Sequence, residues 1–187
     1  MKVASSALIA LLSGQNQYAM WEQYVITLAD GSIIRWSTAD GPYTLITRTD
    51  TWRYLVVPAT DTTDYSGASF DDSGWAQDTA PFGSLPAYGG YGQGWPSIDT
   101  VVPGDSPLRA IWMRKTVTLP RTGQIAVEMQ YDNAPYAWIN GTPLTLTSHS
   151  VWTATAAFTA TTLSAVFAFR VDNLGTEFYA DLAATMT

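Results

Sequence analysis

Two adjacent carboxylates, Asp71 and Asp72, are the first residues of this sequence whose types and spacing suggest chemistry. Hydrolysis of a glycosidic bond uses two carboxyl groups that face each other across the substrate. Neighbours in the chain do not face each other in this way. The pair therefore does not meet the requirement for a glycosidase.

The single histidine, His149, would have to be the base of any Ser-His-Asp triad. It lies in the segment 147–150, which we predict to be a turn, and the chain has no Gly-x-Ser-x-Gly motif. The absence of cysteine excludes disulfides, thiolate nucleophiles and Cys-zinc sites. These residue types predict a protein that is not an enzyme and has neither a catalytic residue nor a cofactor.

Three aromatic residues, Tyr88, Tyr91 and Trp95, lie in a glycine-rich segment that spans residues 88–96. Aromatic rings stack on the weakly polar faces of sugars, so the three rings are candidate glycan-binding residues. The alternative is that they pack over an open end of the domain or against a neighbouring subunit. The sequence leaves both interpretations open.

The charge of the chain limits the classes of partner that it is expected to bind. Only 13% of the 187 residues are charged, against ~25% in typical domains. The nine Lys and Arg residues are scattered and the net charge is −7, so no basic face for nucleic acid is predicted. The net negative charge is expected to aid solubility, or to favour cationic partners or divalent metal ions.

Alternation of side chains predicts the main domain. Ile125, Val127, Met129 and Tyr131 alternate with small or polar residues, as in a half-buried strand, and segments 152–158 and 163–172 show the same period. Strands are also expected at 52–57 and 178–182, whereas 60–107 is expected to be mostly loop. Many short strands without a long amphipathic helix predict an all-β sandwich.

The first forty residues predict a separate segment. Leu8, Leu11 and Leu12 lie near one face of a short expected helix, and this apolar run is too short to span a membrane. A β-hairpin is expected over 21–38, because Asp30-Gly31 suits a tight turn between aromatic and β-branched runs. The rings on this hairpin are Trp21, Tyr24 and Trp36. Together the leucines and rings are candidate docking residues for another protein, or else for this chain's own sandwich.

A series of short motifs resembles one family. The motifs are Phe70-Asp71-Asp72-Ser73-Gly74-Trp75, Ala80-Pro81-Phe82-Gly83, Ile111-Trp112-Met113-Arg114-Lys115, Leu119-Pro120, Tyr131-Asp132-Asn133, Trp138-Ile139-Asn140-Gly141, Val171-Asp172-Asn173 and Phe178-Tyr179-Ala180-Asp181-Leu182. In this order they resemble the galactose-binding-like jelly roll, a β-sandwich found in carbohydrate-binding modules and virus tail proteins. The resemblance implies that Asp71 and Asp72 belong to a turn.

The same resemblance implies further roles. Four aromatic residues are expected in the core, namely Trp75, Trp112, Trp138 and Phe169. Domains of this kind often hold a structural Ca²⁺, and the carboxylates that could contribute to such a site are those of Asp61, Asp64, Asp71, Asp72 and Asp181. No spacing typical of an EF-hand is present, so no metal ligand is assigned.

The opening of the chain resembles a second family. Ala7-Leu8-Ile9-Ala10-Leu11-Leu12, followed by Tyr24-Val25-Ile26-Thr27-Leu28-Ala29-Asp30-Gly31-Ser32-Ile33-Ile34-Arg35-Trp36-Ser37, is similar to the N-terminus of tail-hub and baseplate proteins of long-tailed bacteriophages. The resemblance implies an attachment segment over 1–45 and a jelly-roll domain over 46–187. After Asp40 the chain departs from the hub pattern, so hub functions are not carried across.

Together the two resemblances imply a component of a bacteriophage tail tip or baseplate, made in the host cytoplasm and carried in the virion. Its partners would be other tail proteins and host surface polysaccharide, and a homotrimer is expected by analogy. Two alternatives remain: a purely structural connector that binds no sugar, and the carbohydrate-binding module of a secreted polysaccharide-degrading system.

Overall fold

The computed structural model describes residues 23–27, 33–37, 42–83, 98–102, 109–150, 152–173 and 179–187. The chain divides into two compact units, Met1–Gly41 and Pro42–Thr187. Several predictions fall outside the described residues and are not tested by the structure. They concern the N-terminal helix with Leu8, Leu11 and Leu12, the ring of Trp21, and the loop rings Tyr88, Tyr91 and Trp95.

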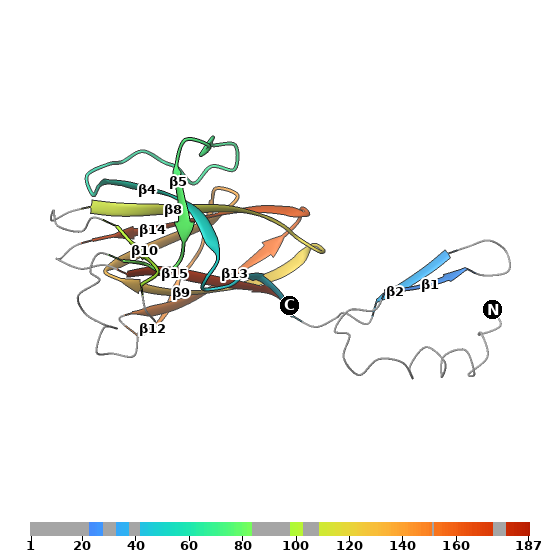
Figure 1. Ribbon diagram of the computed structural model, residues 1–187. Helices are drawn as coiled ribbons and strands as arrows, with labels where there is room; N and C mark the ends of the chain where they lie inside the picture. Colours follow the sequence, from blue (N-terminus) through green and yellow to red (C-terminus); the bar gives the residue numbers. More distant parts are fainter. Residues whose placement is uncertain are drawn as a thin grey trace. The chain divides into compact units, whose positions relative to one another are not determined.

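The first unit contains the predicted hairpin. Strand β1 (Gln23–Thr27) pairs antiparallel with β2 (Ile33–Ser37), and Tyr24 lies opposite Trp36 in the register (Figure 1). The pairing confirms the hairpin that the aromatic and β-branched runs of the sequence predict. The turn residues Asp30 and Gly31 lie outside the described part of the chain.

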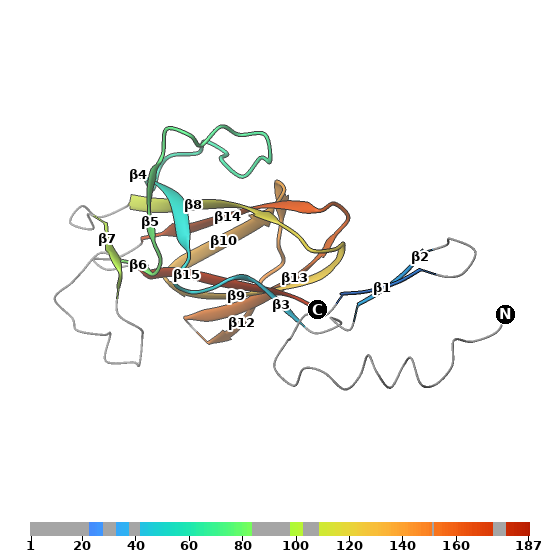
Figure 2. The same cartoon turned by 45° about the vertical axis from the view of Figure 1, so that its right-hand side comes forward.

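The second unit is a sandwich of two sheets (Figures 1 and 2), which confirms the all-β prediction. The six-stranded sheet has the order β11-β10-β14-β8-β4-β5, and all its pairs are antiparallel. Its strands are β4 (Thr51–Pro58), β5 (Ala76–Thr79), β8 (Arg109–Thr118), β10 (Ala134–Ile139), β11 (Thr142–Pro143) and β14 (Ser164–Asp172).

The seven-stranded sheet has the order β12-β13-β9-β15-β6-β7, and β3 pairs with β15 beside this path. Its strands are β3 (Tyr43–Ile46), β6 (Phe82–Gly83), β7 (Thr100–Val101), β9 (Gly123–Asp132), β12 (Thr147–Ser150), β13 (Thr153–Ala160) and β15 (Tyr179–Met186). The described residues contain no helix, and therefore none that is long and apolar enough to cross a membrane.

The core lies between the two sheets and follows the predicted alternation. From β9 the buried side chains are Ile125, Val127, Met129 and Tyr131, as the sequence predicts. Other strands contribute Trp52, Phe82, Ile111, Met113, Phe167, Phe169, Leu182 and Met186. The hairpin turn at Asn140-Gly141 is also confirmed, because both residues have positive φ (53° and 77°).

The segment between β4 and β5 covers the outer face of the six-stranded sheet, the face turned away from the other sheet (Figures 1 and 2). Tyr65 from this segment makes edge contacts with the rings of Phe70, Trp75 and Trp112, with centroids 5.2–5.5 Å away. A second apolar cluster forms here around Trp112 and Ala168. We call residues 59–75 the covering loop.

The guanidinium of Arg114 on β8 holds the covering loop to the sheet. Its Nε donates to Asp72 Oδ2 at 3.1 Å, and its terminal nitrogens donate to the backbone oxygens of Tyr65, Gly67 and Phe70. The side chain is only 2% exposed. A buried charge is tolerated when it is paired and its hydrogen-bonding groups are satisfied, and these bonds meet that condition.

The described part of the span 60–107 is mostly loop, as expected, and the short strands β5, β6 and β7 within it leave no alternating pattern. One sequence prediction needs correction in this unit. His149 was expected in a turn, but it lies on β12, where a register irregularity between Ser148 and Ser150 interrupts the pairing. Its exposed ring bonds Thr155 Oγ1 at 2.7 Å.

We predict that Arg114→Met lowers the free energy of unfolding by about 3–5 kcal/mol, because it leaves loop carbonyls and Asp72 without their buried partner. The matched control is Arg53→Met, since Arg53 lies opposite Arg114 in the register and also bonds Asp72. Arg53 is 38% exposed and screened by water, so its loss costs under about 1 kcal/mol. Urea denaturation measures both, and equal losses would contradict the role assigned to Arg114.

Candidate functional site

The register of the six-stranded sheet brings aromatic and charged residues together on its outer face. Tyr136 on β10 lies opposite Arg170 on β14, which lies opposite Trp112 on β8. In the next outward-facing row, Trp138 lies opposite Ala168. Because the alanine side chain is small, the Trp138 ring has room to reach Trp112 across the intervening strand.

The three rings form a nearly parallel series. The centroids of Tyr136 and Trp138 are 6.2 Å apart with an interplanar angle of 22°, and those of Trp138 and Trp112 are 5.0 Å apart with 25°. Trp112 is buried, Trp138 is half-buried and Tyr136 is 46% exposed. A ligand from solvent can therefore reach Tyr136 and Trp138, while Trp112 supports them from beneath.

Arg170 supplies the positive charge beside these rings. Its Nε donates to Asp172 Oδ1, and its terminal nitrogens donate to the backbone oxygens of Asp61 at 3.1 Å and Ala59 at 3.3 Å. The guanidinium carbon lies 5.5 Å from the centre of the Trp112 ring. Each terminal nitrogen keeps a further hydrogen, so this fixed fork can also donate to a ligand.

The covering loop adds two carboxylates opposite the rings. Asp61 Oδ1 accepts from the Thr63 backbone N–H at 2.8 Å, and Asp64 Oδ1 accepts from that of Ser66 at 2.8 Å. Asx turns of this kind are why aspartate is common in loops. The hydrogen bonds from Thr63 and Ser66 hold the pKa values of the Asp61 and Asp64 carboxyls below the ordinary 3.8.

These groups enclose an open hollow of about 390 Å³. Its lining combines aromatic rings, carboxylates, a guanidinium and threonine hydroxyls, from Ala59, Asp61, Thr62, Thr63, Asp64, Trp112, Tyr136, Trp138, Arg170 and Asp172. Among the described residues, Asp64 and Asp172 each have a second carboxylate oxygen that accepts no hydrogen bond. The hollow can thus stack a flat ligand face and bond its hydroxyl groups at the same time.

The lowered pKa values oppose acid catalysis by the loop carboxylates. A general acid that works near neutral pH needs a pKa raised toward the operating pH. Asp61 and Asp64 are shifted the other way and stay ionised. The arrangement is therefore suited to accepting hydrogen bonds and attracting positive charge.

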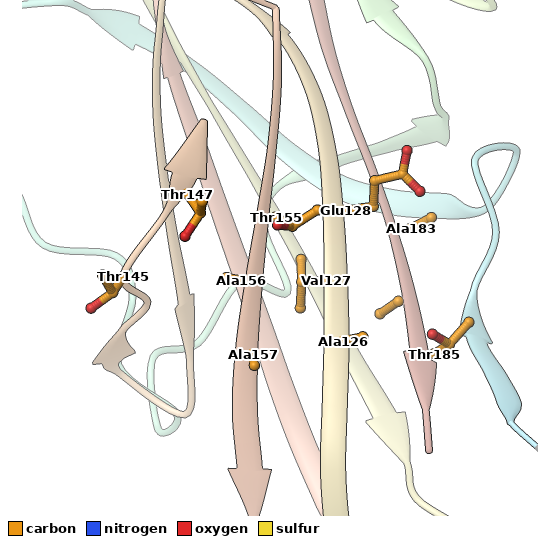
Figure 3. Close-up of a pocket in the computed structure, with 11 residues that line it drawn as sticks. Ala126, Val127, Glu128, Thr145, Thr147, Thr155, Ala156, Ala157, Ala183 and Thr185 are labelled. Carbon is orange, nitrogen blue, oxygen red and sulfur yellow. The ribbon is translucent and has the colours of Figure 1, made fainter. Parts of the chain in front are cut away.

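A larger hollow of about 660 Å³ lies on the outer face of the opposite sheet, over β9, β13 and β15 (Figure 3). Figure 3 shows that the labelled side chains are short, except for Glu128. Most are alanines and threonines, including Ala126, Thr155 and Thr185. This hollow has no ring to stack on a ligand and a single charged side chain, so the smaller one is the better candidate site.

Asp71, Asp72 and the aromatic residues predicted for the core lie in turns or packed clusters. Asp71 accepts from the Ser73 backbone N–H at 2.9 Å, and the Trp75 backbone N–H donates to the carbonyl of Asp72 at 3.0 Å, so this pair belongs to a turn. Phe169 lies in the inter-sheet core as expected. Trp112 is also buried as expected, in the second cluster, whereas Trp75 and Trp138 are half-buried against that cluster on the outer face.

The five candidate carboxylates do not fit a calcium cage. Asp61, Asp64 and Asp71 accept backbone bonds in separate turns, whereas Asp72 and Asp181 pair with arginines. Within the described ranges no group of three or more His, Cys, Asp or Glu residues could hold a metal ion.

Asp181 is instead a buried structural carboxylate. Its side chain is 0% exposed, and Oδ2 accepts from Arg48 Nη1 at 2.9 Å. Oδ1 and the neighbouring Oε1 of Gln130 are both buried without a partner among the described residues. Burial raises the pKa of Asp181 above 3.8, although Arg48 opposes the shift.

Sequence reasoning did not select Tyr136 or Arg170. The signals were present as Tyr136-x-Trp138 and Arg170-x-Asp172, because residues two apart on a strand share one face. Only the register of β10 against β14 shows that these two pairs lie side by side.

Comparisons with known proteins bear on the fold. No protein-family model and no curated protein matches the sequence. The sandwich resembles part of a solved structure, a calcium-binding mutant of β-glucuronidase 2 from Bacteroides uniformis, at TM-score 0.51 and 20% identity. The match covers 78% of this chain but only 18% of the glucuronidase.

Weaker matches are to sandwich domains of other proteins. One is the PA14 domain of the MpAFP antifreeze protein, at TM-score 0.40 and 17% identity, covering 79% of this chain and 82% of that one. Another is a PA14 sugar-binding domain from an RTX adhesin, at TM-score 0.31 and 16% identity, covering 88% and 85%. At 20% identity the glucuronidase match bears on the fold alone and assigns no activity.

We predict that Asp181→Asn becomes more stabilising, relative to the unchanged protein, as the pH rises above 3.8. The folded state with Asp181 binds its proton more tightly than the unfolded chain, so ionisation at higher pH costs folding free energy. Asparagine has no charge, and its amide can donate to Gln130. Chemical denaturation from acid to neutral pH measures the difference, and a constant or falling difference would contradict the assignment.

Proposed function

We propose that the sandwich Pro42–Thr187 binds a saccharide at the hollow beside Tyr136 and Trp138 and does not transform it. One observation carries this proposal: the accessible ring pair stands on successive outward-facing positions of one strand, next to a guanidinium and carboxylate oxygens that have unused hydrogen-bonding capacity. Sugars present both apolar faces and hydroxyl groups, and this hollow matches both.

We propose that the bound saccharide is not hydrolysed. The loop carboxylates have pKa values that disfavour a general acid. The only histidine of the chain, His149, lies exposed on β12 of the other sheet and bonds Thr155. These features support recognition without hydrolysis.

The sequence motifs are the basis on which we propose a particular type of sandwich and a biological setting for it. The motif series supports a galactose-binding-like jelly roll, and the opening segment supports attachment to a bacteriophage tail tip or baseplate. Binding at a shallow site would gain from many copies on one particle, because neighbouring sites raise the effective concentration. In this proposal the hairpin β1-β2 contacts another tail protein.

Two alternatives retain the same sandwich. As a module of a secreted polysaccharide-degrading system, the chain would bind sugar at the same hollow but would need a catalytic partner. As a pure connector, it would bind no sugar, and the rings would contact neighbouring subunits. Saccharide binding separates the connector from the other two.

We predict that Tyr136→Ala and Trp138→Ala each weaken saccharide binding by up to about tenfold, because each removes a ring that stacks on the ligand. Tyr136→Phe keeps the ring and should change the affinity less than about threefold. Isothermal titration against oligosaccharides released from bacterial surface polysaccharide measures the affinities.

Two controls make this test specific. Leu163→Ala removes another exposed apolar side chain, 57% exposed, and should leave binding unchanged. Trp95→Ala tests the glycine-rich loop as the site. If Trp95→Ala abolishes binding while Tyr136→Ala and Trp138→Ala do not, the site is the loop. If no oligosaccharide binds even an arrayed form of the protein, the connector alternative holds.

We predict that Trp36→Ala reduces incorporation of the chain into phage particles, because it removes a large ring from the hairpin proposed to attach it. Saccharide binding by the isolated protein should be unaffected. Quantitative mass spectrometry of purified particles measures the incorporated amount, with Leu163→Ala as the reference. Equal incorporation of both variants would contradict attachment through the hairpin.

A further inference from the structure

The candidate site carries an excess of negative charge. Three carboxylates and one guanidinium line the hollow, so two negative charges are left in excess. Arg170 is paired with Asp172, which leaves Asp61 and Asp64 as the excess charges. Arg114 lies beneath the same loop, but its charge is matched by Asp72.

The excess charges are held in place and stay ionised. Backbone N–H groups of Thr63 and Ser66 fix the orientation of the two carboxylates. Hydrogen bonds lower the pKa of both carboxyls, so a ligand meets two anions at neutral and mildly acidic pH. The site is thus built to keep this charge rather than to neutralise it.

We infer that the saccharide bound at this hollow carries a protonated amine, as in a polymer of glucosamine units. This inference rests on the proposed function and names its ligand class. An ammonium group gains from the negative potential of Asp61 and Asp64. It also gains from the electron-rich faces of Tyr136 and Trp138, which attract cations. The sugar ring supplies the apolar face that stacks on the same rings.

The same charges reject the opposite class of sugar. A uronic acid or sulfated sugar would bring a negative charge to the two carboxylates, and like charges brought together cost binding free energy. Arg170 can still donate hydrogen bonds to a ligand, but its one positive charge is paired with Asp172 and is outnumbered by the three carboxylates of the hollow. Charge therefore selects among saccharides that would all stack equally well.

The test compares four oligosaccharides of similar length on the full chain by isothermal titration calorimetry. They consist of glucosamine, of N-acetylglucosamine, of glucose and of galacturonic acid. We expect glucosamine oligosaccharide to bind about tenfold more tightly than the two neutral ones, and the galacturonate oligosaccharide to bind least. Binding of the glucosamine probe should weaken as the pH rises through the pKa of its amine, whereas binding of the neutral probes should not.

Asp64→Asn is the decisive variant, because asparagine keeps the side-chain oxygen that accepts from Ser66. It should weaken glucosamine binding about fivefold more than it weakens binding of the glucose oligosaccharide, because only the amine loses an opposite charge. The charge-matched control is Glu128→Gln on the opposite sheet, which removes one exposed carboxylate and should alter neither affinity.

The outcomes separate the inference from the proposed function. Tighter binding of a neutral or acidic probe than of the glucosamine probe would overturn the charge preference and leave saccharide binding intact. Equal effects of Asp64→Asn and Glu128→Gln on glucosamine binding would overturn the assignment to this hollow. If none of the four probes binds while oligosaccharides from bacterial surface polysaccharide do, the inference fails and the proposed function stands; if neither set binds, both fail.

Discussion

The arrangement of the outer face depends on one buried charge. Arg114 stands on β8, and its guanidinium bonds Asp72 and three backbone oxygens of the covering loop. A segment without secondary structure of its own cannot bury its backbone oxygens unless donors meet them. With these bonds the loop lies on the sheet, closes over Trp112 through Tyr65, and carries Asp61 and Asp64 to the rim of the hollow.

Strands and turns of the sandwich could be predicted where the local sequence pattern alone determines them. The alternation of Ile125, Val127, Met129 and Tyr131 is sufficient to predict β9 and its buried face. Asn140-Gly141 is sufficient to predict the turn after β10, because both residues tolerate positive φ. The short strands β5, β6 and β7 could not be predicted, since segments of two to four residues show no period.

The site could not be predicted, because it depends on pairing between distant segments. Trp112 and Trp138 were both expected in the core; Trp112 is buried as expected, whereas Trp138 is only half-buried. Hydrophobicity does not say which face of a sheet a side chain occupies. The alternation of β8 and β10 places both rings on the outer face, where the loop buries one and leaves the other half open. The opposite sheet shows the contrast, since its outward residues are mostly alanine and threonine and offer no ring.

The two kinds of contact in the hollow have different structural origins. Tyr136 and Trp138 belong to a strand whose neighbours fix their spacing, whereas Asp61 and Asp64 belong to the covering loop and accept hydrogen bonds from residues of that loop. At the proposed site, exchanges of the two aspartates would change the charge beside the rings, while the strands that hold the rings stay the same. Related chains could thus differ in ligand preference through a handful of loop substitutions, on an unchanged aromatic foundation.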